Sequence, residues 1–184
     1  MMDGQIYVVH ITVVIKISSY CLLKKELIFT VKINSFISCM GYKQFTLMLL
    51  YKGADIHSKD DDGSACSSGY KDIVLLLIEA EADVNCDDDD GRTALHAACC
   101  NGYKDITLLL IDKGADTSCK DSYGYTALHN ACDHGHKNIV LLLINKGADI
   151  HSKDIQRKTA LHLAFNNGHK FVALLLLDRG VYSL

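Results

Sequence analysis

The chain has 184 residues, of which 49% are hydrophobic and 22% are charged, with a formal net charge of −3. This balance excludes intrinsic disorder over most of the length and leaves room for one compact domain or a short repeat array. The charge lacks the basic excess typical of nucleic-acid binding, so we expect no nucleic-acid partner.

The first 40 residues are expected to be an irregular segment outside any repeat. Most residues of Ile6–Ile17 and many of Leu27–Ile37 are β-branched, which favours strand over helix. An acid and no base precede the apolar residues, the reverse of a secretory signal. The longest early uncharged run, Gly4–Ile15, is twelve residues, whereas a transmembrane helix needs roughly 20. We therefore expect neither export nor a membrane span.

A repeating pattern begins at residue 41 and is incomplete at first. Glycine followed by Tyr or His and then Lys recurs 33 residues apart from Gly69 onward, but Gly41 precedes Gly69 by only 28. The five missing residues fit a deletion between Asp62 and Gly69, at the start of a first helix. We therefore expect a half-repeat at 41–60 and an internally deleted repeat at 61–88.

Three fuller units follow, at 89–121, 122–154 and 155–184. Thr-Ala-Leu-His recurs at Thr93, Thr126 and Thr159, 33 residues apart each time. Each unit reads as two short helices, with apolar residues at helical spacing on either side of an Asn-Gly or equivalent turn. One helix pair cannot bury its apolar faces alone, so neighbouring units must stack.

The end of each unit also repeats. Lys113-Gly114 recurs as Lys146-Gly147 and as Arg179-Gly180. Glycine at this place is typical of a helix C-cap. The residues after Gly114 are polar and rich in Asp, Ser and Gly, which predicts a loop.

This pattern resembles the ankyrin repeat family over about residues 41–184. The family motif Asp-x-x-Gly-x-Thr-Pro-Leu-His-x-Ala corresponds to residues 88–98, which read Asp-Asp-Asp-Gly-Arg-Thr-Ala-Leu-His-Ala-Ala. Ala replaces the Pro of the family in all three fuller units. The resemblance implies an all-α solenoid of helix-turn-helix units with β-hairpin-like loops, and a non-enzymatic module that binds another protein.

In the family, the loop tips and the first helices form the concave partner surface. Matching its variable positions one by one implies a contact set of Asp89, Asp90, Arg92, Cys100, Asn101, Ser122, Tyr123, Tyr125, Asp133, His134, Ile155, Gln156, Arg157, Lys158, Asn166 and Asn167. Tyr123 and Tyr125 are the expected anchors, because aromatics with a polar tip are enriched at binding hot spots. Tyr125 could instead pack against a neighbouring loop.

Charge is uneven along this surface. Residues 54–92 hold twelve acidic residues against three basic ones, whereas Arg157 and Lys158 lie at the other end of the array. Such polarity orients a partner and speeds encounter more than it adds affinity. Arg157 also stands where earlier units have Gly91 and Gly124, so it is strained if that turn needs a positive φ.

The residues that could suggest metal or catalytic chemistry do not have the spacing that such sites require. Stacked repeats hold His96, His129 and His162 apart, and the resemblance gives them a local hydrogen bond with the preceding Thr instead. The cluster at 132–136 lacks zinc-site spacing. The acidic runs at 60–62 and 87–90 do not match an EF-hand loop. We expect no metal, no cofactor and no enzymatic activity.

The cysteines indicate the compartment. Eight are present, none in a Cys-x-x-Cys pair, and several fall within apolar helical patterns. This favours a reduced, intracellular and cytoplasmic protein.

A row of leucines recurs six residues after each repeat glycine, at Leu47, Leu75, Leu108, Leu141 and Leu174. Such a row is either a bias of the lineage or a seam for self-association. Both Leu108 and Leu141 are expected to face solvent. Two further hypotheses stay open: a decayed fragment of a longer array without distinct function, and a membrane-peripheral adaptor anchored through residues 5–37.

Overall fold

The computed structural model describes residues 69–79 and 81–181. The irregular segment, the half-repeat, the proposed anchor at 5–37 and the site of the deletion lie outside these residues. The described part holds seven helices: α5 (Lys71–Glu79), α6 (Ala94–Cys100), α7 (Lys104–Asp112), α8 (Ala127–Asp133), α9 (Lys137–Asn145), α10 (Ala160–Asn166) and α11 (Lys170–Val181).

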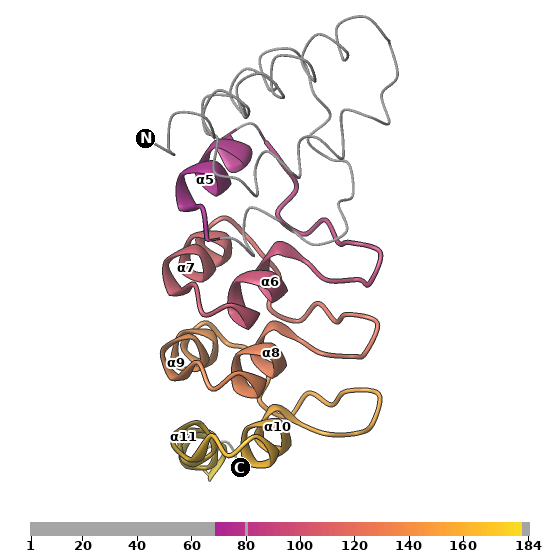
Figure 1. Ribbon diagram of the computed structural model, residues 1–184, viewed down its shortest axis with the longest axis vertical. Helices are drawn as coiled ribbons and strands as arrows, with labels where there is room; N and C mark the ends of the chain where they lie inside the picture. The colour runs from indigo at the N-terminus through magenta and orange to yellow at the C-terminus, as the bar shows by residue number, and fades with distance from the viewer. Residues whose placement is uncertain (1–68, 80, 182–184) are drawn as a thin grey trace, which may run out of the picture.

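The helices form two parallel columns (Figure 1). The first helices α6, α8 and α10 stack in one column, and the second helices α5, α7, α9 and α11 stack in the other. Three connecting loops project from the side of the first helices, away from the second helices. This arrangement is the all-α solenoid that the repeat pattern predicts. No helix within the described residues is both long enough and apolar enough to cross a bilayer.

Each first helix begins at a threonine. Thr93, Thr126 and Thr159 are in extended backbone, and each donates its N–H to Nδ1 of the His three residues later, at 3.1–3.2 Å. This bond uses one of the backbone groups that a helix end leaves unpaired. The local Thr–His pairing is confirmed, and Ala supports the helix where the family has Pro because Ala is the best helix former.

The turn between the two helices depends on glycine. Gly102 has φ 82° and Gly135 has φ 73°. A ring from the next unit lies over each glycine, so that a Cβ there would be 2.8 Å from His136 or 2.5 Å from His169. A larger residue would therefore be strained in its backbone and would also block the neighbouring unit.

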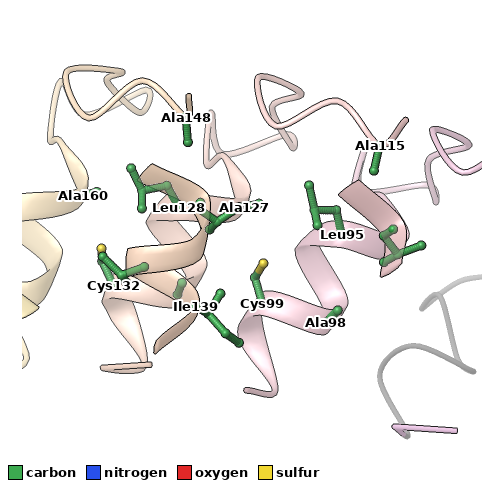
Figure 2. Packing of buried hydrophobic residues seen from close by; sticks show 14 of the residues in the cluster. Leu95, Ala98, Cys99, Ala115, Ala127, Leu128, Cys132, Ile139, Ala148 and Ala160 are labelled. Carbon is green, nitrogen blue, oxygen red and sulfur yellow. The ribbon is translucent and has the colours of Figure 1, made fainter. Parts of the chain in front are cut away.

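The core runs as one column between the two helix layers (Figure 2). Leu95 and Leu128 of the first helices are fully buried, as is Ile139 of a second helix. Burying one such side chain contributes about 1.5–3 kcal/mol. Cys99 and Cys132 are also fully buried and behave as small apolar residues where adjacent units meet.

The loops fold back as tight hairpins. At their tips, Asp88, Asp121 and Asp154 donate their N–H to the carbonyl four residues later, at 2.9–3.0 Å. Isolated antiparallel bridges join Asp87 to Thr93 and Lys153 to Thr159. These contacts give the β-hairpin-like loops that were expected.

One expected helix end is wrong. α7 ends before Gly114, whose φ is 93°, whereas α11 continues through Arg179 and Gly180 to Val181. Gly114 is followed by the Ala-Asp that begins a loop, and Gly180 is followed by Val181 instead. The glycine permits a helix to end but does not force it to, so the following residues decide.

Candidate functional site

An aspartate shapes each loop tip, and it is buried at Asp88 and Asp154 and half-buried at Asp121. The Asp88 carboxylate accepts the N–H of Asp90 at 3.0 Å and of Arg92 at 2.7 Å. Asp121 holds Tyr123 and Tyr125 in the same way, at 2.9 and 2.8 Å. These side-chain bonds to the backbone fix the turn, as Asx-turns do. The tip residues on either side are therefore presented in a set conformation.

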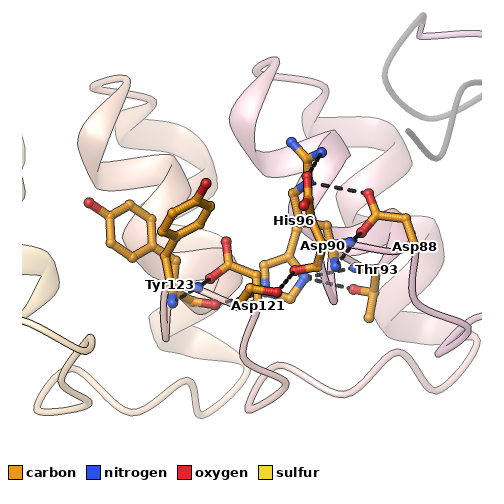
Figure 3. A network of polar contacts seen from close by, with 9 residues as sticks. Asp88, Asp90, Thr93, His96, Asp121 and Tyr123 are labelled. Atoms are coloured by element: carbon orange, nitrogen blue, oxygen red, sulfur yellow. Dashed lines mark hydrogen bonds and ion pairs between the residues drawn. The ribbon is translucent and has the colours of Figure 1, made fainter. Parts of the chain in front are cut away.

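The first tip is acidic and is tied together by one arginine (Figure 3). Arg92 pairs with Asp88 at 3.2 Å and with Asp90 at 2.7 Å. Arg92 and Asp90 are solvent-exposed, and surface pairs of this kind add little stability. Asp89, between them, is exposed and unneutralised by either contact, so this tip keeps a negative surface.

Neighbouring tips are bonded to one another. Ser122 donates its N–H and its hydroxyl to the Asp90 carbonyl, at 2.8 and 2.6 Å. Ile155 donates its N–H to the Tyr123 carbonyl at 3.1 Å. The loop-tip residues of three units thereby form a continuous edge.

The two expected anchors differ in their surroundings. The Tyr123 side chain is 60% exposed. Tyr125 is half-buried, with its ring stacked on His129 at 5.5 Å between ring centroids, and its carbonyl accepts a bond from His96 Nε2 at 3.0 Å. The Tyr123 side chain is open to solvent, whereas the Tyr125 ring packs on a histidine of its own unit and not on a neighbouring loop.

A second strip lies at the ends of the first helices. Cys100 Sγ is 3.7 Å from His134 Nε2, and Asn167 donates to the Asp133 carboxylate at 2.6 Å. Burial, with the nearby Asp133 charge, raises the pKa of the Cys100 thiol. A raised pKa leaves little thiolate, so Cys100 does not have the environment of a catalytic nucleophile. Asn101 and Asn166 are exposed in the same strip.

The basic end has the strained residue that the sequence indicated. Arg157 has φ 63°, close to the 73° of Gly91 and the 76° of Gly124. Ile155, Gln156 and Arg157 are exposed, and Lys158 is half-buried. The sixteen expected contact positions therefore fall into two strips, and all of them retain exposed surface.

The leucine row is interrupted. Leu108 is 37% exposed and Leu174 is 62% exposed, but Leu75 and Leu141 are half-buried, and Leu47 lies outside the described residues. The expectation that Leu141 faces solvent is wrong. Self-association through this row stays a prediction.

Two features escaped the sequence reading. His96 and His129 each donate Nε2–H to a carbonyl of the next unit, of Tyr125 at 3.0 Å and of Lys158 at 3.4 Å. Phe165 is 78% exposed where the equivalent Cys99 and Cys132 are buried. Aligning the repeats position by position would have pointed to both features. Among the described residues, no cluster of three or more His, Cys, Asp or Glu could hold a metal.

Comparison with known families decides the classification. A family model for ankyrin repeats, in three copies, matches residues 63–154 and 119–183. The chain belongs to the ankyrin repeat family. No curated protein matches it. Ankyrin repeats are generally protein–protein interaction modules.

Proposed function

We propose that this ankyrin-repeat chain is a non-enzymatic module that holds a partner protein against its loop tips and first helices. The observation that supports this most directly is the loop-tip edge. Its three tips are joined by hydrogen bonds to backbone carbonyls, while their side chains differ in charge and polarity. A rigid edge with variable side chains binds without paying a large ordering cost.

The charges along this edge favour one orientation of the partner. Asp89 and Asp90 lie on the first tip, and Arg157 and Lys158 lie on the third. Tyr123 lies between them on the second tip, and its exposed ring offers apolar area with a polar hydroxyl. A partner with basic residues at one end of its contact surface and acidic residues at the other would fit this order.

Photo-crosslinking tests the proposal in a lysate of the source organism. The full chain with a benzophenone amino acid at position 123 should give discrete adducts, whereas the same group at Lys113, exposed at the end of α7, should not. The unlabelled chain should compete for the adducts. An Asp89→Lys competitor should be at least about tenfold weaker, since like charges across an interface are strongly disfavoured.

The matched control for charge is Asp105→Lys. Asp105 is exposed in the first turn of α7, outside both strips. This variant should compete as well as the unmodified chain. Absence of adducts specific to position 123 would favour the decayed-fragment hypothesis instead. A cytoplasmic location of the chain and the absence of catalytic activity are parts of this proposal. The membrane anchor proposed for residues 5–37 lies outside the described residues.

A second contact, self-association through the leucine row, is supported by the exposure of Leu108 and Leu174. Sedimentation of the full chain at tens of micromolar tests it. If the row forms a seam, Leu108→Lys should shift the chain toward monomer, and Lys104→Ala on the same helix should not. A monomeric parent chain would remove this contact.

A further inference from the structure

Asparagine precedes glycine at two places in the chain, and both lie at the turn between the two helices of a unit. The pairs are Asn101-Gly102 and Asn167-Gly168, whereas the unit between them has His134-Gly135. Asparagine is one of the chemically labile residues. A following glycine makes it more so, because glycine has no side chain to obstruct its own nitrogen as that nitrogen approaches the asparagine side chain.

The backbone has the same form at both Asn-Gly pairs. Asn101 has φ −91° and ψ 0°, and Asn167 has φ −90° and ψ 6°. The glycines that follow have φ 82° and 74°. Both asparagines are exposed at the end of a first helix. A difference in reactivity between the two pairs must therefore come from the hydrogen bonds that hold them.

The Asn101-Gly102 pair is held by few bonds. The Asn101 side chain donates one hydrogen bond, from Nδ2 to the Ala97 carbonyl at 2.9 Å. That carbonyl also accepts the N–H of Asn101 at 3.2 Å, so it keeps a partner when the side chain turns away. Within the described residues, the Gly102 N–H donates no hydrogen bond. The Asn101 side chain can therefore move to the Gly102 nitrogen without leaving a carbonyl unpaired.

The Asn167-Gly168 pair is held by the unit before it. Asn167 Nδ2 donates to the Asp133 carboxylate at 2.6 Å and to the Asp133 carbonyl at 3.1 Å. A hydrogen bond to an ionised carboxylate is stronger than one between neutral groups. The Gly168 N–H donates to the Phe165 carbonyl at 3.1 Å. Both the side-chain amide and the glycine nitrogen are therefore occupied at this pair.

We propose that Asn101-Gly102 is a site of spontaneous deamidation in the folded chain, and that the bonds at Asn167-Gly168 protect that pair. The Gly102 nitrogen loses its proton to solvent base and attacks Cγ of Asn101, which closes a cyclic imide. The Asn101 amide nitrogen takes up a proton and leaves as ammonia. Water then opens the imide at either carbonyl, which gives aspartate or isoaspartate at position 101. Water is the only co-reactant, and no group is oxidised or reduced.

The two products alter the molecule in different ways. Aspartate at position 101 adds a negative charge to the second strip, at the ends of the first helices. Isoaspartate lengthens the backbone between positions 101 and 102 by one carbon atom. The His136 ring of the next unit packs on this turn, 2.8 Å from the place of a Gly102 Cβ, and its Nε2 donates to the Cys100 carbonyl at 3.0 Å. The isoaspartate form should therefore be the less stable of the two.

Incubation of the full chain at pH 8, followed by peptide mass spectrometry, tests the proposal. In the folded chain, position 101 should deamidate at least about tenfold faster than position 167, because one or two more hydrogen bonds must break at the slower pair. In urea the two positions should react at similar rates, because these bonds are lost. Equal rates in the folded chain, or a faster reaction at position 167, would overturn the proposal.

Variants assign the protection to the carboxylate of the preceding unit. Asp133→Ala removes the stronger bond to Asn167, so position 167 should deamidate several-fold faster while position 101 keeps its rate. Asp178→Ala is the matched control, because Asp178 is exposed on α11, and it should change neither rate. Circular dichroism checks that both variants stay helical. A folded Asp133→Ala chain in which position 167 reacts as slowly as before would contradict the proposal. No partner protein is needed, so the result is independent of the proposed function.

Discussion

His96 in one repeat donates its Nε2–H to the Tyr125 carbonyl in the next, at 3.0 Å. Its other nitrogen, Nδ1, accepts the N–H of Thr93, which can only donate. The two bonds together require a neutral imidazole with its proton on Nε2. One side chain thus caps its own helix and also joins two repeats.

The joining bond should make His96 more important for stability than its equivalent in the last unit. His96→Ala leaves the Tyr125 carbonyl and the buried Thr93 N–H without this partner, so we expect a loss of about 2–4 kcal/mol in unfolding free energy. His162→Ala is the matched control, since His162 is exposed and makes only the local bond. It should cost about 1 kcal/mol or less. Urea denaturation of both variants measures the difference, and equal losses would contradict the cross-repeat role.

Acid should weaken the array through the same histidines. Burial is the main cause that lowers the pKa of His96 and of His129 below the usual value. The unfolded chain therefore binds more protons than the folded chain as pH falls below about 6.5, so stability present above that pH is lost on acidification. The slope is at most about 1.4 kcal/mol per pH unit for each histidine.

Comparison of urea midpoints at pH 7.5, 6.5 and 5.5 checks this prediction. The double variant His96→Gln, His129→Gln retains hydrogen-bonding groups but cannot titrate, so its stability should fall less between pH 7.5 and 5.5. His151→Gln is the control, because His151 is exposed in a loop. An identical pH dependence in all three proteins would show that these histidines do not set it.

The parts of the fold that depend on nearby residues could be predicted from sequence. Thr93 and His96 are three residues apart, and the glycine turns recur at a fixed spacing, so helix starts and helix pairs followed directly. Arg157 at a glycine position indicated strain if the turn needs a positive φ, and Arg157 has φ 63°.

The parts that depend on the neighbouring repeat could not. Tyr123 and Tyr125 are similar in sequence, but one is exposed and the other stacks on a histidine of its own unit while receiving a bond from the unit before. The bond from His96 to the Tyr125 carbonyl crosses from one unit to the next, and a local pattern does not contain such a contact.

Arg157→Gly should stabilise the chain. A left-handed conformation costs a residue with a Cβ roughly 1–2 kcal/mol, and Arg157→Gly removes this cost. Glycine is more flexible in the unfolded chain, which lowers the stability by about 0.5–1 kcal/mol. The net expectation is about 0.5–1 kcal/mol of added stability. The reciprocal change, Gly124→Arg, should destabilise by about 2 kcal/mol or more, because it adds the same strain and brings a Cβ to 2.9 Å from the Ile155 nitrogen. Chemical denaturation of both variants tests the pair, and a loss of stability in Arg157→Gly would show that Arg157 makes a compensating contact.

The described cysteines should differ in reactivity. Burial raises the pKa of Cys99 and of Cys132 to about 12, so at pH 8 only about one in 10⁴ of these thiols is ionised. Cys86, Cys100 and Cys119 are only half-buried. Iodoacetamide at pH 8, read by peptide mass spectrometry, should label these three slowly but faster than Cys99 and Cys132, whose pKa values are raised further. In urea all five should react at similar rates, and rapid labelling of Cys99 in the native protein would contradict the burial.

Tyr125→Ala should destabilise the array, whereas Tyr123→Ala should not. The Tyr125 ring stacks on His129, and such aromatic pairs contribute about 0.5–1.5 kcal/mol beyond the area they bury. With the half-buried area lost as well, we expect Tyr125→Ala to lower the unfolding free energy by about 2–3 kcal/mol. Tyr123 is mostly exposed, so its removal should change stability by less than about 0.5 kcal/mol.

A second measurement, the pKa of His129, separates the loss of the ring stack from a general loss of packing. Removing the ring admits water to His129, and since burial is the main cause that lowers its pKa, that pKa should rise in Tyr125→Ala and stay the same in Tyr123→Ala. NMR titration of the His129 ring protons measures it, and an unchanged pKa in Tyr125→Ala would mean that the stack does not shield the histidine.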